Sequence, residues 1–123
     1  MDLSILEHLE AKQRQLMREV PHDLPNNLNR IQTSMLGVIE EVIEYGNSLG
    51  RKPWRPKPQP REEQLEEFAD ILFFFLELKA QSDFTWEEIV REYDRKWSVN
   101  IKRYNDLKKG DTSWDKRSEK REL

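Results

Sequence analysis

The chain of 123 residues contains no cysteine, and this absence excludes disulfides, zinc–thiolate centres and thiol nucleophiles. It is also compatible with the cytoplasmic location that we expect. Long hydrophobic runs are missing near the N-terminus, because charged residues interrupt the segment MDLSILEHLEAKQ. We therefore expect neither a secretion signal nor a membrane-spanning helix there, and no membrane partner.

An excess of charge of one sign is missing as well. The 21 Lys and Arg residues nearly balance the 24 Asp and Glu residues, so the formal net charge is only -3 although 37% of the residues are charged. Such a balance creates no overall field that attracts nucleic acid, and we expect no nucleic-acid partner. The basic segment RKPWRPKPQPR has a single aromatic residue, too few for a platform on which bases stack.

What is present is a helical pattern of apolar residues, without any strand signal. The first helix is expected to end before Pro21, and PHDLPNN then forms a turn. The segment GNSLG stops the second helix near Gly46, while Thr85 followed by Glu88 has the capping-box spacing that begins the last helix. The expected helices cover residues 3–20, 28–46, 62–81 and 85–107.

The expected fold is therefore all-α. A hydrophobic content of 36% suits one compact bundle of about four to five helices over residues 1–107, with a charged tail at 108–123. Residues 71–76, ILFFFL, are apolar on every helical face, which predicts burial on all sides. Four short helices leave part of this segment uncovered, so we expect homo-oligomerisation to complete the fold.

Two pairs of carboxylates stand at the i, i+3 spacing in the predicted helices. Glu41 and Glu44 form one pair, Glu67 and Asp70 form the other, and the members of each pair lie about 60° apart around the helix. On packed antiparallel helices the four acids would meet, and they would stay ionised only beside a cation. Hard oxygen ligands at this density suit Mg²⁺, with Mn²⁺ as a substitute. The alternative is that both pairs belong to ordinary solvated helix faces.

A cationic stripe runs along the last predicted helix. Lys96, Asn100 and Arg103 recur at steps of four and three residues and therefore share one face. Arg binds phosphate oxygens bidentately, Lys adds a point charge and Asn adds a neutral donor. Taken alone, the stripe fits a solvated helix face better than a site. Combined with a metal site, it indicates a polyphosphate ligand.

Together these residues resemble the all-α nucleoside triphosphate pyrophosphohydrolases, which include MazG-like proteins and the dimeric dUTPases. The resemblance covers roughly residues 31–105. The signature of that superfamily, EExxE followed by ExxD, is similar to Glu40-Glu41-x-x-Glu44 and Glu67-x-x-Asp70. A dUTPase pattern also resembles this chain at Asn47, Lys52 and Trp54. The motif KxxxNxxR is similar to the chain at Lys96, Asn100 and Arg103.

The resemblance implies hydrolysis of a nucleoside triphosphate to the monophosphate and pyrophosphate by an assembly of two or four copies. Glu41 or Glu40 would accept the proton of the attacking water. Trp54 would either stack on the base or anchor the loop. The implied Mg²⁺ ligands are Glu41, Glu44, Glu67 and Asp70. The implied substrate-binding residues are Asn47, Lys52, Trp54, Lys96, Asn100 and Arg103.

Two alternatives remain at the level of the sequence. Gln13-x-x-Leu16 is similar to the QxxLD element of dimeric dUTPases, but Met17 stands where that element has an acid. Both dUTP and other nucleotides are therefore candidate substrates. The competing hypothesis is a non-catalytic helical interaction module, in which the charges are solvated and the phenylalanines contact a partner. It requires that the four carboxylates do not converge.

Overall fold

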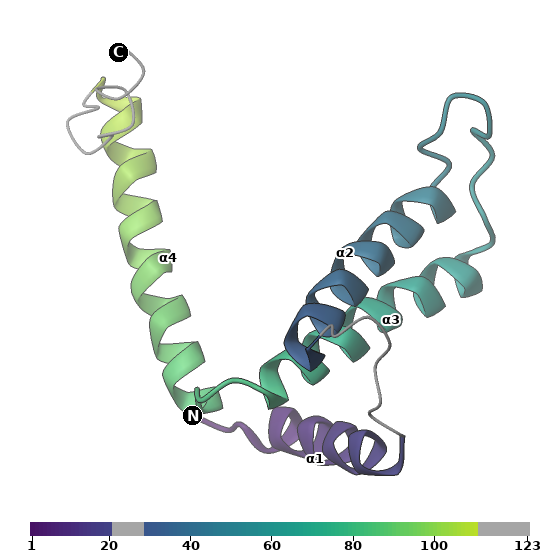
Figure 1. Ribbon diagram of the computed structural model, residues 1–123. Coiled ribbons are helices and arrows are strands. Elements are labelled where there is room, and N and C mark those ends of the chain that lie inside the picture. The colour runs from purple at the N-terminus through teal and green to yellow at the C-terminus, as the bar shows by residue number, and fades with distance from the viewer. Residues whose placement is uncertain (21–28, 111–123) are drawn as a thin grey trace. The chain divides into compact units, whose positions relative to one another are not determined.

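The computed structural model describes residues 1–20 and 29–110, and in this part of the chain it contains only helices as regular elements (Figure 1). The prediction of an all-α fold is confirmed. The predicted turn at 21–27 and all but the first three residues of the predicted tail at 108–123 lie outside the described residues. No helix in the described ranges is long and apolar enough to cross a membrane. The helices are α1 (Ser4–Glu19), α2 (Arg30–Ser48), α3 (Arg61–Ala80) and α4 (Trp86–Lys108).

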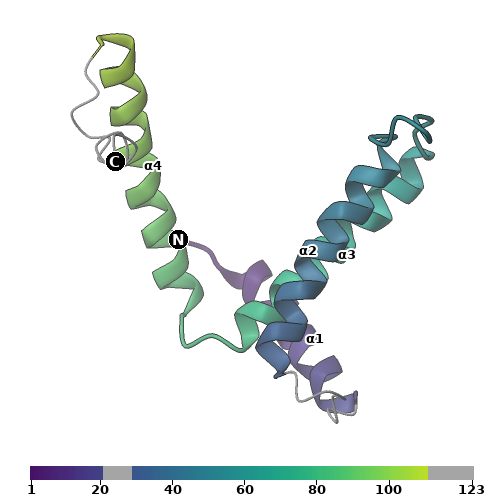
Figure 2. The same cartoon turned by 45° about the horizontal axis from the view of Figure 1, so that its top comes forward.

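The chain divides into two compact units, Met1–Asp83 and Phe84–Leu123. The single domain over residues 1–107 stays a prediction. The first unit holds α1, α2 and α3, and the second holds α4. Within the first unit, α2 and α3 lie side by side as an antiparallel hairpin, and α1 packs against α3 (Figures 1 and 2). The hairpin places the two acid pairs on neighbouring helices.

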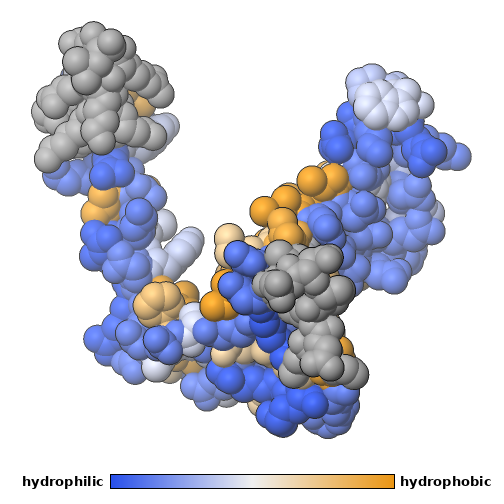
Figure 3. Space-filling view, in the orientation of Figure 1, coloured by the Kyte–Doolittle hydropathy of each residue, from blue (hydrophilic) through white to orange (hydrophobic). Residues whose placement is uncertain are grey.

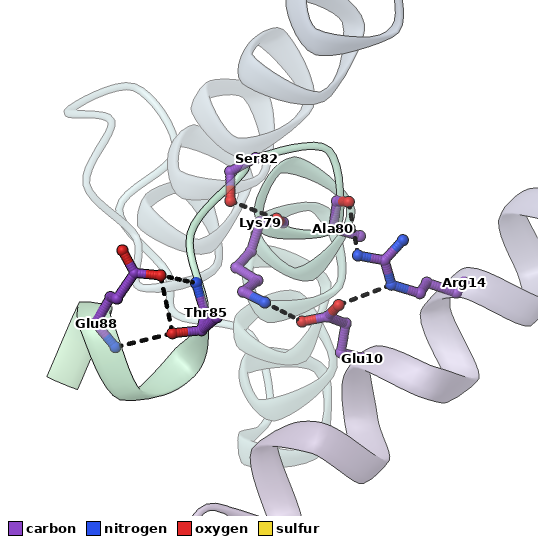
Figure 4. Close-up of polar contacts among 7 residues, drawn as sticks. All are labelled: Glu10, Arg14, Lys79, Ala80, Ser82, Thr85 and Glu88. Atoms are coloured by element: carbon purple, nitrogen blue, oxygen red, sulfur yellow. Dashed lines mark hydrogen bonds and ion pairs between the residues drawn. The ribbon is translucent and has the colours of Figure 1, made fainter.

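Local sequence explains where the helices begin and end. Pro21 excludes the helical conformation for the preceding residue, and Val20 is indeed extended, with φ -91° and ψ 128°. The side chain of Asn29 caps α2 by accepting a hydrogen bond from the third helical N–H at 2.8 Å. At the start of α4, Thr85 and Glu88 form the predicted capping box, with both reciprocal hydrogen bonds at 3.1 Å (Figure 4).

Small residues of α2 face α3 and let the two helices approach closely. Ser34 is fully buried and accepts a hydrogen bond at its Oγ from Nε2 of Gln81, at 2.8 Å. A Cβ at Gly37 would lie 2.3 Å from Cδ1 of Phe74, so the contact depends on glycine at this position. Glu41 lies one turn after Gly37 on the same helical face, and its carboxylate is therefore directed to the contact between α2 and α3.

Charged residues join α1 to α3. The largely buried carboxylate of Glu10 accepts hydrogen bonds from Nζ of Lys79 and, at 2.7 Å, from Nε of Arg14 (Figure 4). Arg14 also donates to the carbonyl oxygen of Ala80 at 2.9 Å. Burial by itself would raise the pKa of Glu10, but the hydrogen bonds from Lys79 and Arg14 outweigh it and hold the pKa below the usual value. We call Glu10, Arg14 and Lys79 the α1–α3 ion cluster.

The apolar face of α2 points away from α3. Its large side chains are each about half exposed, and Ile39 reaches 54%. Figure 3 shows hydrophobic side chains along one edge of the arm that α2 and α3 form. We call this surface the α2 outer face, and it consists of Ile31, Met35, Leu36, Ile39, Val42 and Ile43.

The single chain leaves part of residues 71–76 uncovered, as expected for a bundle of four short helices. Leu76 is buried at 4% exposure, but Phe73 is 46% exposed and Phe75 is 42% exposed. The reason is that one helical hairpin covers only one side of α3, while α1 covers the region around Leu76 and Ala80. An all-round apolar helix segment needs neighbours on every side, and this unit has too few helices to supply them.

Candidate metal centre and adjoining cavity

Carboxylates from two helices meet in the first unit. Glu41 of α2 and Glu67 and Asp70 of α3 each offer one oxygen, and these three oxygens lie within 4.8 Å of one another. All three side chains are partly buried. Oxygens that share one Mg²⁺ lie at most about 4.2 Å apart, twice the usual bond length, so small side-chain rotations would let the group chelate an ion.

The electrostatics of this group are unfavourable without a cation. Burial, followed by the charges of Asp70 and Glu67, raises the pKa of Glu41. Burial, followed by the charges of Asp70 and Glu44, raises the pKa of Glu67. Among the described residues, no Lys or Arg forms an ion pair with Glu41, Glu67 or Asp70. A bound divalent cation would relieve both the repulsion and the cost of burial.

The other two predicted acids of α2 lie outside the group of three. Glu44 is exposed and stands nearly one turn after Glu41, at the rim of the contact with α3. It is close enough for its charge to raise the pKa of Glu67. Glu40 is exposed and joins neither the group nor the cavity described next. The structure thus brings together three of the four predicted metal ligands, with the fourth beside them.

A cavity of about 450 Å³ adjoins the acid group at Glu67. It lies where α2 ends, where α3 begins and where the connecting loop returns, and this volume is in the range of small-molecule sites. Its wall carries both charges, with carboxylates from Glu44, Glu63 and Glu67 and cations from Lys52 and Arg55. We call it the loop cavity.

Asn47 also lines the loop cavity, as its place in the predicted site requires. Its Oδ1 atom is buried, and no donor in the described part of the chain forms a hydrogen bond to it. A buried acceptor without a donor is unusual and costly in a folded protein. An N–H or O–H group of a ligand in the cavity would satisfy it.

The predicted aromatic residue of the loop lies outside this cavity. Trp54 is 77% exposed, so it is not a buried packing anchor. Nζ of Lys52 lies 6.0 Å from the centroid of the Trp54 ring, at the limit of a cation–π contact. Most of the indole surface is open to solvent and accessible to a ligand.

The predicted cationic stripe belongs to the second unit. Lys96, Asn100 and Arg103 are all exposed on α4, as a ligand-binding or a solvated face would be. Their role remains a prediction from the sequence.

Sequence reasoning missed Arg55, Gln59 and Glu63, which line the loop cavity. A signal for Arg55 was available in the segment Lys52-Pro53-Trp54-Arg55. Proline is favoured at the second position of a β-turn, and such a turn brings its first and fourth residues side by side. The structure has this turn, with the N–H of Arg55 donating to the carbonyl oxygen of Lys52 at 2.9 Å. Gln59 and Glu63 had no comparable signal.

Comparisons of the chain with models of protein families, with curated proteins and with solved structures found no match.

Proposed function

We propose that this chain is a metal-dependent nucleoside triphosphate pyrophosphohydrolase, MazG-like or dUTPase-like, which acts on the nucleotide pool of the cytoplasm. The observation that carries the proposal is the meeting of Glu41, Glu67 and Asp70 from two helices, with their oxygens within 4.8 Å and no cationic partner among the residues that the structure describes. The resemblance of the EExxE and ExxD motifs supplies the class of substrate. The loop cavity beside the acids supplies room for it.

The set of donors fits Mg²⁺. It consists of carboxylate oxygens alone, with Glu44 at the rim as a fourth ligand, and Mg²⁺ and Mn²⁺ prefer such hard ligands. When bound, Mg²⁺ polarises phosphate oxygens and lowers the pKa of water. Two ligands come from α2 and two from α3, and the close contact at Gly37 holds these helices in register.

The proposed reaction is hydrolysis at the α-phosphorus. A water oxygen forms a bond to this phosphorus. At the same time, the bond between the phosphorus and the oxygen that bridges to the β-phosphate breaks. Pyrophosphate leaves with the bridging oxygen, and the proton of the water passes to a carboxylate, for which Glu41 and Glu40 are the candidates. Asn47, Lys52, Trp54 and the α4 residues Lys96, Asn100 and Arg103 are proposed to bind the nucleotide and to stabilise the charge on the leaving group.

The test of this proposal is the release of pyrophosphate from a panel of nucleoside triphosphates that includes dUTP. The assay is run with Mg²⁺, with Mn²⁺ and with a chelator. Metal-dependent release confined to dUTP would assign a dUTPase-like enzyme, and release from several nucleotides would assign a MazG-like one. Absence of release from every nucleotide would refute the hydrolase.

The α2 outer face supports a proposal that copies of the chain associate, as a homodimer or a homotetramer. Covering the exposed half of one such side chain contributes about 1 kcal/mol to the free energy of association. Six such side chains together approach the free energy of unfolding of a small domain. The face carries no charge that would select a different partner, so a second copy is the simplest cover. The competing helical interaction module is disfavoured, because it required that the four carboxylates do not converge, and three of them meet.

Self-association can be tested by light scattering during size-exclusion chromatography. The variant Ile39→Lys places a charge at the centre of the α2 outer face, and we expect it to shift the protein to a smaller assembly. Gln15→Lys on the exposed side of α1 is the matched control and should leave the mass unchanged. A monomeric wild-type protein would refute the proposed assembly, whatever the result of the hydrolysis assay.

A further inference from the structure

The loop that connects α2 to α3 has a closely packed backbone. Gly50 has a φ of 77°, and a Cβ at this position would lie 2.2 Å from the carbonyl oxygen of Pro56, so the two limbs of the loop touch there. The N–H of Gln59 donates to the carbonyl oxygen of Ser48 at 2.8 Å and joins the returning limb to the end of α2. Four prolines further restrict the chain. The backbone of such a loop is restricted before a ligand binds, which lowers the entropic cost of binding.

This backbone brings two of the five cations of residues 51–61 to the loop cavity. The turn from Lys52 to Arg55 sets these two residues side by side, and both line the loop cavity. Arg51, Lys57 and Arg61 do not line it. The fold thus distinguishes Lys52 and Arg55 from three other cations within the same eleven positions of the sequence.

Lys52 and Arg55 do not neutralise a carboxylate in the described part of the chain. Among the described residues, neither Lys52 nor Arg55 forms an ion pair, although Glu44 and Glu67 line the same cavity. The cavity therefore has acids on the side of the metal centre and cations on the side of the loop. A metal-bound polyphosphate matches both sides, because the ion meets the acids and the remaining phosphate oxygens meet the cations.

We propose that Arg55, assisted by Lys52, binds the phosphate oxygens of the substrate in the loop cavity. The planar guanidinium of Arg55 contacts two oxygens at once, and the ammonium of Lys52 adds a point charge. The unsatisfied Oδ1 of Asn47 in the same wall is an acceptor, so it would meet a sugar hydroxyl or a base N–H of the nucleotide and not a phosphate oxygen. This inference takes its substrate class from the proposed function, but it places the phosphate contacts in the first unit, on a residue that the sequence motifs do not include.

The experiment compares Arg55→Gln with Arg51→Gln, which removes the same charge from the same loop outside the cavity. Binding of inorganic pyrophosphate with Mg²⁺ is measured by calorimetry, and KM and kcat are measured for the best nucleotide of the panel. We expect Arg55→Gln to weaken pyrophosphate binding about tenfold or more and to raise KM by a similar factor, since a bidentate charged contact is lost. Arg55→Lys should fall between Arg55→Gln and the wild type, and Arg51→Gln should match the wild type.

The outcomes separate this inference from the proposed function. Hydrolysis by the wild type with equal KM values in Arg55→Gln and Arg51→Gln would overturn the role of Arg55 and leave the hydrolase intact. Pyrophosphate binding that depends on Arg55, without hydrolysis of any nucleotide, would support the phosphate site and refute the hydrolase. A wild-type protein that does not bind pyrophosphate would overturn the inference. Arg55 is exposed, so the melting temperatures of the variants should match and exclude misfolding as the cause.

Discussion

Two groups of charged side chains lie at helix contacts of the same unit, and their carboxylates have opposite surroundings. In the α1–α3 ion cluster, Lys79 and Arg14 compensate Glu10 and keep its pKa low. In the candidate metal centre, burial and neighbouring acids raise the pKa of Glu41, and no cation of the described chain compensates it. A buried acid paired with cations serves the fold, whereas acids left together without a cation cost stability and point to function.

Removal of a carboxylate from the metal centre should have the largest effect. We expect Glu67→Gln and Asp70→Asn to lower kcat/KM by at least about 100-fold, because each removes a metal ligand and its charge. Glu66→Gln is the control, since Glu66 is exposed beside Glu67 and lies outside the acid group. Full activity in both Glu67→Gln and Asp70→Asn would show that the acids are not a catalytic centre.

Breaking the α1–α3 ion cluster should instead unfold the protein more easily. Lys79→Met leaves the carboxylate of Glu10 buried with one partner fewer, and we expect a loss of about 3 kcal/mol in the free energy of unfolding. The control is Lys102→Met, which breaks an exposed pair with Asp106 and should cost less than about 0.5 kcal/mol. Urea denaturation measures both values. Equal losses in the two variants would remove the distinction between the buried pair and a surface pair.

The sequence predicts much of this arrangement because local rules decide it. The capping box at Thr85, the end of α1 before Pro21 and the i, i+3 spacing of Glu67 and Asp70 follow from patterns a few residues long. Contacts between distant segments do not have that basis. The pair of Glu10 with Lys79 spans 69 positions, and no local pattern marks either residue as a partner of the other.

Orientation of the helices was the least predictable property. The apolar pattern of α2 identified a helix and its apolar face, and one expects such a face to pack on the rest of the chain. In the structure the small residues Ser34 and Gly37 pack on α3, and the apolar face is turned outward. A hydrophobic pattern shows which side is to be covered, but it does not say whether the same chain or another copy covers it.

Addition of Mg²⁺ should stabilise the protein through the metal centre alone. At a concentration about ten times the dissociation constant, we expect the melting temperature to rise by roughly 5 °C at neutral pH. The rise should shrink as the pH falls through the raised pKa values of Glu41 and Glu67, because protonated carboxyls bind Mg²⁺ poorly. Thermal melts with Mg²⁺ and with chelator across this pH range measure the difference. An equal rise in Asp70→Asn would place the ion elsewhere.

The dependence of stability on pH without metal should differ in sign between the two clusters. The folded pKa of Glu10 is lowered, so its contribution to stability is present above the unfolded value of about 4.5 and is lost as the pH falls through the folded pKa. The folded pKa values of Glu41 and Glu67 are raised, so their ionisation destabilises the fold at neutral pH, and protonation relieves this as the pH falls. Melts of Glu10→Gln and Glu41→Gln against pH in chelator separate the two contributions. Parallel curves for both variants would contradict the opposite signs.

The smallest expected effect is a gain in stability from the loss of a functional acid. In chelator at neutral pH, Glu67→Gln removes one of the charges that repel each other between α2 and α3, and the melting temperature should rise by about 1–3 °C. The same substitution at Glu10 should lower the melting temperature, because there the carboxylate is compensated by Lys79 and Arg14. A lower melting temperature for Glu67→Gln would mean that this carboxylate stabilises the fold. The carboxylates of Glu10 and Glu67 would then both stabilise the fold, and the physical reason for placing a metal ion between α2 and α3 would be lost.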